Sequence, residues 1–228
     1  MNPVYPAGYD ANSCFDDTNS ANESGNEVND LSNEIFSYGP MDAPVAIHFF
    51  NQMLDQIEEK CDNNQTLGLM NIDAIKYDKD YQISLSESDH TTNGNAKAPE
   101  LLENSAYDDV GYTSAADVFQ AGVHLFQMHF GYYPYGNADN KDWWYSKMVH
   151  GNPMFWKAME VTKPDVDPEF KNLINGMTDS DPFARMTIDE IRNHPWMQNN
   201  QETDDFTLSC MIEDRRIQSE ERDKSDKF

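Results

Sequence analysis

Positive charge is scarce in this sequence. The 228 residues hold 16 Lys and Arg against 41 Asp and Glu, which gives a formal net charge of -25, and the first cationic side chain along the chain is Lys60. A protein this acidic is repelled by the phosphates of nucleic acids and by anionic lipid. We therefore expect neither nucleic acid nor a membrane surface to be its partner.

Long apolar runs and paired cysteines are also missing. No run approaches the roughly 20 apolar residues that a membrane span needs, and the chain opens on a polar stretch unlike a secretory signal. The cysteines are Cys14, Cys61 and Cys210, which are odd in number, far apart and without a CxxC pair. A disulfide scaffold and a zinc site are therefore not expected, and a reducing, cytoplasmic location fits.

Three segments follow from composition. Residues 1–30 are acidic, rich in Asn and Ser and poor in apolar groups, so we expect them to be disordered. Residues 31–197 hold the periodic apolar pattern of one globular domain. Residues 198–228 are polar and of mixed charge, which predicts a charged tail that is loose or forms a short solvated helix.

The apolar spacing predicts a mainly α fold, a helical bundle with a small β-hairpin. Apolar residues recur at helical spacing over 44–59, and residues 118–130 are apolar on nearly all sides, which is typical of a central buried helix. Thr187-Ile188-Asp189-Glu190 has capping-box spacing, so a helix should start at Thr187 and end at His194-Pro195. Further elements are expected at 75–77 and 82–85 as a hairpin, at 143–159 as one or two aromatic-rich helices, and at 170–177 as a helix.

Four motifs, in order, resemble the C-terminal lobe of a eukaryotic protein kinase. The resemblance spans about residues 35–197 and is closest in kind to the calcium/calmodulin-dependent group. It implies a kinase-like fold. The motifs are Ala98-Pro99-Glu100, the helix start Ala116-Asp117-Val118-Phe119-Gln120-Ala121-Gly122-Val123, the late arginine segment Asp181-Pro182-Phe183-Ala184-Arg185-Met186-Thr187, and His194-Pro195-Trp196.

The resemblance also implies where the catalytic positions of the family fall. Leu69 stands at the catalytic Asp position, Ala74 at the metal-binding Asn position and Glu87 at the metal-binding Asp position. The interval from Leu69 to Glu87, 87 − 69 = 18, is the usual spacing of the family. The chain contains no G-x-G-x-x-G loop and no strand lysine, so the N-terminal lobe is expected to be absent.

These substitutions remove the chemistry of phosphoryl transfer. A Leu side chain cannot accept a proton, an Ala side chain cannot coordinate magnesium, and Glu87 is one methylene longer than the carboxylate it replaces. We expect an inactive kinase-like protein, a pseudokinase, with no catalytic residue, no cofactor, no bound metal and no ATP binding. Two alternatives stay open: a split serine/threonine kinase whose missing parts come from another chain, and a degenerate fragment without a stable role.

The resemblance implies, by contrast, that three scaffold residues of the family are retained. The resemblance pairs Glu100 with Arg185 in a buried ion pair and assigns to Asp117 the role of accepting backbone hydrogen bonds from the catalytic loop. The simpler interpretation of Glu100 and Arg185 is two exposed charges. Retained scaffold beside lost catalytic groups predicts a kept fold and a lost reaction.

A protein partner is expected on two grounds. The face that the N-terminal lobe covers in a complete kinase should be bare here, or capped by residues 1–40. The segment holding Trp143, Trp144 and Trp156 corresponds to a helix that kinases use for docking, although each ring could instead be core. Adjacent residues of a helix point about 100° apart, so at least one of Trp143 and Trp144 should be exposed. With acidic surroundings, such an anchor predicts a partner with a basic surface.

Overall fold

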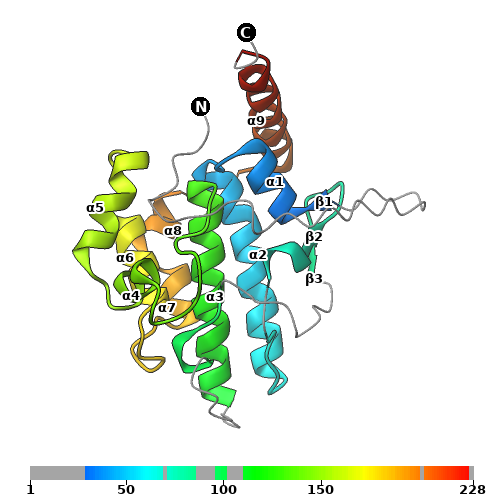
Figure 1. The fold of residues 1–228 in the computed structure, drawn as a ribbon. Helices are drawn as coiled ribbons and strands as arrows, with labels where there is room; N and C mark the ends of the chain where they lie inside the picture. Colours follow the sequence, from blue (N-terminus) through cyan, green and yellow to red (C-terminus); the bar gives the residue numbers. More distant parts are fainter. Residues whose placement is uncertain (1–28, 69–70, 86–95, 102–109, 201–202, 226–228) are drawn as a thin grey trace.

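Two long antiparallel helices form the centre of the molecule. The computed structural model describes residues 29–68, 71–85, 96–101, 110–200 and 203–225. Helices α2 (Ala43–Asp62) and α3 (Val110–Phe130) lie side by side in it (Figure 1). The amide of Met41, just before α2, donates to the carbonyl of Met128 near the end of α3 at 2.7 Å. The expected helix at 44–59 and the central buried helix are thus both present.

Helix α3 is longer than its apolar pattern. It begins at Val110, eight residues before the expected start. Ser114 and Ala115 in this early part are only half-buried, so the helix does not need large apolar side chains there. Apolar spacing therefore could not predict this first part of the helix. The helix ends at Gly131, whose φ of +80° is costly for any residue with a Cβ and whose amide donates to the carbonyl of Gln127 at 2.7 Å.

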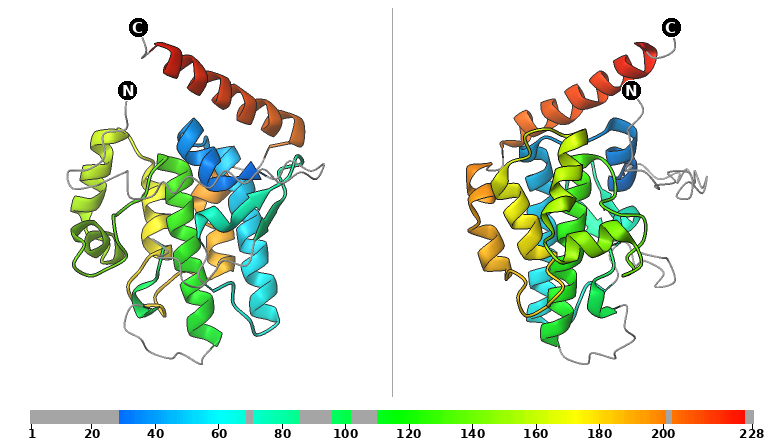
Figure 2. Two further views of the ribbon diagram at one scale, coloured as in Figure 1. Left: turned by 45° about the vertical axis from the view of Figure 1, so that its right-hand side comes forward. Right: turned by 60° about the vertical axis from the view of Figure 1, so that its left-hand side comes forward.

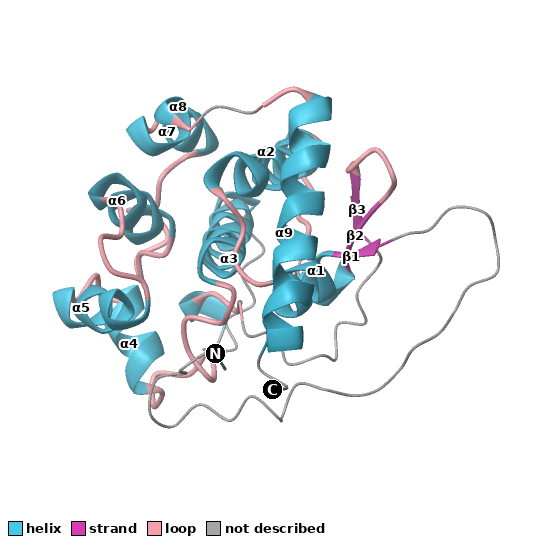
Figure 3. Ribbon diagram, turned by 90° about the horizontal axis from the view of Figure 1, so that it is seen from above, coloured by secondary structure: helices cyan, strands magenta, loops and turns pink. Residues whose placement is uncertain are grey.

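Five shorter helices lie on one side of α3 (Figures 1 and 3). Each has a side-chain N-cap, and Thr187 and Glu190 form the expected capping box before α7. Gly122 of α3 lets α6 approach closely, because a Cβ there would lie 2.9 Å from Cβ of Met177. The expected helix end at His194-Pro195 is also the start of a further short helix. The five are α4 (Trp143–Val149), α5 (Pro153–Thr162), α6 (Pro168–Met177), α7 (Ile188–Arg192) and α8 (Pro195–Asn199).

The expected hairpin belongs to a three-stranded antiparallel sheet. Strands β2 (Ile75–Tyr77) and β3 (Ile83–Leu85) pair as predicted, with Tyr77 opposite Ile83. Strand β1 (Asn29–Asp30) adds to the free edge of β2, which the sequence did not indicate. The pairing of β1 with β2 connects the hairpin to the first described residues of the chain. A single turn of 3₁₀ helix, η2 (Ile72–Ala74), comes directly before β2, and another, η3 (Pro99–Leu101), follows β3 in the chain.

The C-terminal segment is not the loose tail or short solvated helix that its polarity predicted. It forms the 21-residue helix α9 (Asp205–Ser225), which lies across α1 (Leu31–Tyr38) at one end of the molecule (Figures 2 and 3). Leu208, Ile212, Arg215 and Ser219 form its buried stripe. The prediction was wrong because half of this stripe is polar, so the helix has little apolar periodicity.

The predicted disorder of residues 1–28 lies outside the described residues. Residues 1–40 were expected as one possible cap of the face left bare by a missing N-terminal lobe. Of these, residues 29–38 form β1 and α1, which contact β2 and α9. Within the described ranges, none of the helices combines the length and the hydropathy that a membrane span requires.

Candidate functional site

Asp117 holds the loop that precedes the expected catalytic position. Its side chain lies on α3 and is 1% exposed, and its Oδ2 accepts a hydrogen bond from the backbone amide of Leu67 at 3.1 Å. The amide of Gly68 also donates to this carboxyl group. Gln120, one turn further along α3, donates from Nε2 to the carbonyl of Gly68 at 2.8 Å. Two side chains of α3 therefore fix residues 67 and 68, as the resemblance implied for Asp117.

The environment of Asp117 changes its ionisation. Burial raises the pKa of this carboxyl group to about 7, although the two backbone hydrogen bonds act in the opposite direction. No arginine or lysine of the described residues pairs with it. Its role is that of a buried acceptor that orders backbone amides.

Only one of the three residues expected at the catalytic and metal-binding positions of the family is described. Ala74 ends η2 directly before β2, is buried, and donates its backbone amide to the carbonyl of Asn71 at 2.9 Å. Its methyl group offers no ligand atom. Leu69 and Glu87 lie outside the described residues, so their placement remains the one that the spacing predicts.

The structure brings Glu100 and Arg185 together in the interior. Two parallel hydrogen bonds of 2.6 Å join the guanidinium to the two carboxylate oxygens, and the side chains are 5% and 1% exposed. The guanidinium also donates to the carbonyls of Ala115 and Asp179 and lies over the ring of Phe119. The simpler interpretation as two exposed charges is wrong. This bidentate pair joins η3, α3 and the segment before α7.

Trp156 is a core residue and not a partner-binding candidate. It is 6% exposed, packs against the rings of Phe126, Phe130 and Phe170, and donates from Nε1 to Oδ1 of Asn175 at 2.9 Å. The expectation failed because α5 is amphipathic and turns this ring inward. With its only polar atom paired, Trp156 has nothing left to offer a partner.

Trp143 is the exposed member of the adjacent pair. It is 46% exposed, whereas Trp144 is half-buried against the core, in line with the expectation that one of the two faces solvent. The charge around this ring is mixed: Lys147 lies over the Trp143 ring, 5.5 Å from its centroid, and the nearby Asp142 accepts the amides of residues 136, 137, 144 and 145. Charge at this position does not specify a basic partner.

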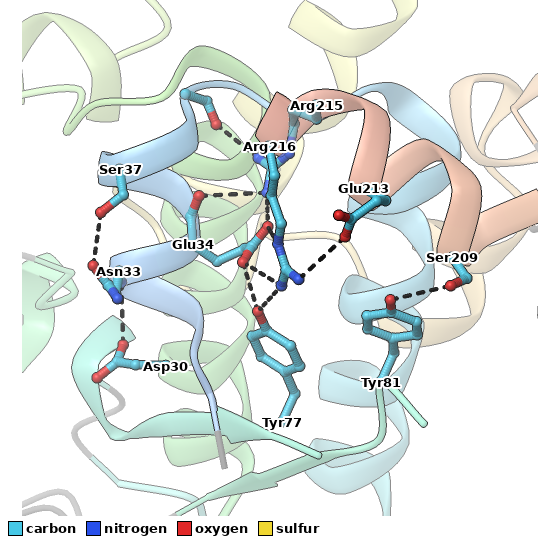
Figure 4. Close-up of polar contacts among 11 residues, drawn as sticks. Asp30, Asn33, Glu34, Ser37, Tyr77, Tyr81, Ser209, Glu213, Arg215 and Arg216 are labelled. Atoms are coloured by element: carbon cyan, nitrogen blue, oxygen red, sulfur yellow. Dashed lines mark hydrogen bonds and ion pairs between the residues drawn. The ribbon is translucent and has the colours of Figure 1, made fainter. Parts of the chain in front are cut away.

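Sequence reasoning missed a second buried cluster, centred on Glu34 (Figure 4). Glu34 is 3% exposed on α1 and receives hydrogen bonds from Arg215, from Arg216 at 2.8 Å and from the hydroxyl of Tyr77 at 2.6 Å. Arg215 also donates to the carbonyl of Gly39 at 2.8 Å. The cluster joins α1, β2 and α9. The signal that could have found it is Leu208, Ile212 and Arg215 at helical spacing.

The arginines keep Glu34 ionised. Burial alone would raise the pKa of Glu34, but the hydrogen bonds from Arg216 and Tyr77 and the charges of both arginines outweigh it and lower that pKa. Burial and the neighbouring carboxylate raise the pKa of Tyr77, so its hydroxyl stays a donor. One buried carboxylate therefore accepts from two cations, and the cluster carries a net positive charge.

The sequence is similar to known protein kinases. A family model of the protein kinase domain matches residues 79–197. The chain is 31% identical over 121 residues to calcium-dependent protein kinase 22 of Oryza sativa subsp. japonica, covering 53% of this chain and 19% of that protein. It is 34% identical over 112 residues to CBL-interacting protein kinase 20 of the same subspecies, covering 48% and 21%.

A third relative lies outside plants. The chain is 28% identical over 102 residues to an Aurora kinase of Dictyostelium discoideum, covering 45% of this chain and 23% of that protein. The chain thus spans less than a quarter of the length of each of these three relatives. The family model begins after residues 67–74, so the match does not cover the expected catalytic loop. Because the model matches more than half of the 228 residues, the chain belongs to the protein kinase family.

Proposed function

We propose that this protein is a catalytically inactive member of the family, a pseudokinase that acts as a protein-binding scaffold or regulator. The observation that carries the proposal is the contact between Asp117 and the amides of residues 67 and 68. It supports the register in which Leu69 stands where the family has its catalytic aspartate. A Leu side chain cannot orient or deprotonate an acceptor hydroxyl.

The same register removes a metal ligand. Magnesium in phosphoryl transfer is bound through oxygen atoms. Ala74 supplies none from its side chain, and Glu87 is the one carboxylate left at the expected metal positions. The Glu100–Arg185 pair, which has no part in the chemistry, is intact. A kept framework with lost reacting groups supports binding as the function.

The binding surface that the structure favours is the exposed side of α4 and α5. Trp143 is 46% exposed, and Met154 and Val161 are 55% and 79% exposed on α5. Large exposed rings are typical anchors of protein interfaces. A pull-down of full-length chain carrying Trp143→Ser should therefore lose partners that wild type retains. Phe206→Ser, at an apolar residue 79% exposed on α9, is the matched control and should retain them. Identical partner sets for all three proteins would contradict this assignment.

The second candidate is a split kinase whose missing elements are supplied by another chain. It is favoured by the names of the relatives, all of which are protein kinases. Titration of the full-length chain at high concentration with magnesium-ATP separates the two. The pseudokinase proposal expects no saturable binding. Saturable binding that Glu87→Ala abolishes would favour the split kinase.

A degenerate fragment would fail a simpler test. A domain with a continuous buried core unfolds cooperatively, whereas a fragment without stable structure melts gradually. We expect a single sharp thermal transition for the full-length chain. A broad, featureless melt would contradict a functional scaffold.

A further inference from the structure

A cavity opens where the end of α2, the start of α3 and the segment 182–189 meet. Its volume is about 370 Å³. Val118 of α3, Met186 and Ile188 form its apolar wall, and Phe183, which is 75% exposed, also lines it. Cys61 of α2 also lines it as a half-buried thiol. A cavity of this size, within the usual range for ligand pockets, can accept a bulky apolar side chain.

Carboxylates surround this apolar wall. Glu58, Asp62 and Asp189 line the same cavity. Glu58 and Asp62 lie in the last turns of α2, where the helix dipole favours cations and makes added carboxylates unfavourable. A cation from outside the cavity would relieve this local repulsion.

The chain's own cations offset only part of this charge. Arg192 pairs with Asp55 at 2.6 Å and with Glu58 at 3.2 Å. Arg185 also lines the cavity, but its charge is matched by Glu100. Within the described part of the chain, Asp62 and Asp189 form no ion pair, although Asp189 lies in the first turn of α7, where the helix dipole favours it. Unmatched negative charge therefore remains beside the apolar wall of this cavity.

We propose that this cavity docks a basic, amphipathic segment of a partner protein. A bulky apolar side chain of that segment enters beside Phe183, and its Lys or Arg side chains pair with Asp62, Asp189 and Glu58. Charge complementarity selects this occupant, and the net charge of -25 attracts it from a distance.

The chain's own termini do not fit this role. Residues 1–28 contain no Lys or Arg, and the carboxylates there would be repelled by the cavity's acidic groups. Arg215 and Arg216 of the C-terminal helix are bound to Glu34 on α1, an element that does not line the cavity. We therefore take a segment of another protein as the occupant. The proposal holds whether or not Trp143 binds a partner and whether or not phosphate is transferred.

A labelled peptide tests the proposal on the full-length chain. The probe is a fluorescent 14-residue peptide of Leu, Phe and Arg with the apolar residues at helical spacing, and its matched partner has Glu in place of every Arg. We expect saturable anisotropy with the Arg peptide and none with the Glu peptide. Asp62→Asn/Asp189→Asn and Phe183→Ser should each weaken binding by roughly tenfold or more.

Two controls separate docking from general attraction of charge. Asp205→Asn/Glu221→Gln removes two charges from exposed positions on α9 and should leave the affinity within about twofold. Trp143→Ser should leave the affinity for the Arg peptide unchanged. Failure of this docking proposal is therefore distinguishable from failure of the proposed binding surface on α4 and α5. Equal weakening by the Asp62/Asp189 and Asp205/Glu221 pairs, or equal binding of the Arg and Glu peptides, would overturn the proposal.

Cys61 reports occupancy directly. In a chain carrying Cys14→Ser and Cys210→Ser, the thiol of Cys61 is the one that maleimide can alkylate. The Arg peptide at saturation should slow this alkylation severalfold, and calcium or magnesium chloride at the same concentration should not. Unchanged alkylation under saturating peptide would mean that the peptide binds elsewhere and would refute the assigned cavity.

Discussion

The two buried arginine–carboxylate sites of this protein are built differently. At the first, Arg185 meets Glu100 one to one through two parallel hydrogen bonds, and backbone carbonyls accept two further donors of the guanidinium. At the second, two arginines share Glu34, and Nε of Arg215 is buried without a partner among the described residues. At the first site one arginine matches one carboxylate and each guanidinium nitrogen donates at least one hydrogen bond, whereas the second site has two arginines to one buried carboxylate and a guanidinium nitrogen without a partner.

The two sites also lie in different parts of the fold. The Glu100–Arg185 pair lies inside the segment that matches the protein kinase domain, between η3 and the start of α7. The Glu34 cluster joins α1 to α9, both of which lie outside that segment. We infer that the first site holds the domain together and that the second fastens α9 to it.

The largest expected effect is that of Arg185→Ala. Removing one partner leaves Glu100 buried and unpaired, which should lower the free energy of unfolding by about 3–5 kcal/mol, a large part of the roughly 5–15 kcal/mol that a domain has. Urea unfolding measures it. The double substitution Glu100→Ala/Arg185→Ala should cost less than the sum of the single ones. The control Arg192→Ala breaks exposed pairs and should cost below about 1 kcal/mol. A cost for Arg185→Ala no larger than this would contradict the comparison.

Glu34→Ala should have a smaller and more local effect. It leaves Arg215 buried beside Arg216, but Arg215 keeps its bond to Gly39 and Arg216 is 25% exposed, so we expect a loss of roughly 2–3 kcal/mol. Amide hydrogen exchange should rise first in 205–225 and not in α3. Glu213→Ala, at an exposed carboxylate 3.9 Å from Arg216, is the control and should change neither. Equal increases in α3 and α9 would refute a local role for this cluster.

Asp117 sharpens the comparison, because it is a buried carboxylate without an arginine. Its pKa of about 7 exceeds the ordinary 3.8, so the folded state binds its proton more tightly than the unfolded state does. Its contribution to stability should therefore fall as pH rises from about 4 to 7, by roughly 3 kcal/mol. Asp117→Asn keeps an oxygen acceptor for Leu67 and does not titrate. As pH rises over this range, the free energy of unfolding of Asp117→Asn should therefore increase relative to that of wild type.

The quantity to measure is the difference in the free energy of unfolding between wild type and Asp117→Asn, because other groups also titrate in both proteins. Burial lowers the pKa of His129 to about 3, so its contribution runs in the opposite direction, rising as pH increases from about 3 to 6.5. This term is common to wild type and Asp117→Asn and cancels in the difference. Parallel stability curves from pH 4 to 7.5 would show that Asp117 ionises normally in the fold.

The smallest expected effect is at Trp143. Because this ring is 46% exposed, Trp143→Ser should change the free energy of unfolding by no more than about 0.5 kcal/mol. Trp156→Ser removes a ring that is 6% exposed and serves as the matched reference, which should cost about 3–5 kcal/mol. Similar costs at the two positions would contradict both the burial of Trp156 and the exposure of Trp143.

The sequence predicted those parts of the fold whose buried faces are apolar. Helix α2, the β2–β3 hairpin and the α7 capping box follow from apolar spacing and turn chemistry, and the Glu100–Arg185 pair follows from motif order. Helix α9 was missed because Arg215 and Ser219 continue a buried stripe that only Leu208 and Ile212 make apolar. Strand β1 was missed because two polar residues that pair through their backbones leave no side-chain pattern.

The direct test of the central claim, a kept kinase fold without its reaction, is a phosphoryl-transfer measurement. Purified full-length chain is incubated with labelled ATP, magnesium or manganese, and generic protein substrates, beside Glu87→Ala prepared in the same way. We predict label at the background level for both proteins, because Leu69 and Ala74 supply neither a base nor a metal ligand. Transfer above background that Glu87→Ala abolishes would contradict the claim, since a contaminating kinase would not respond to that substitution.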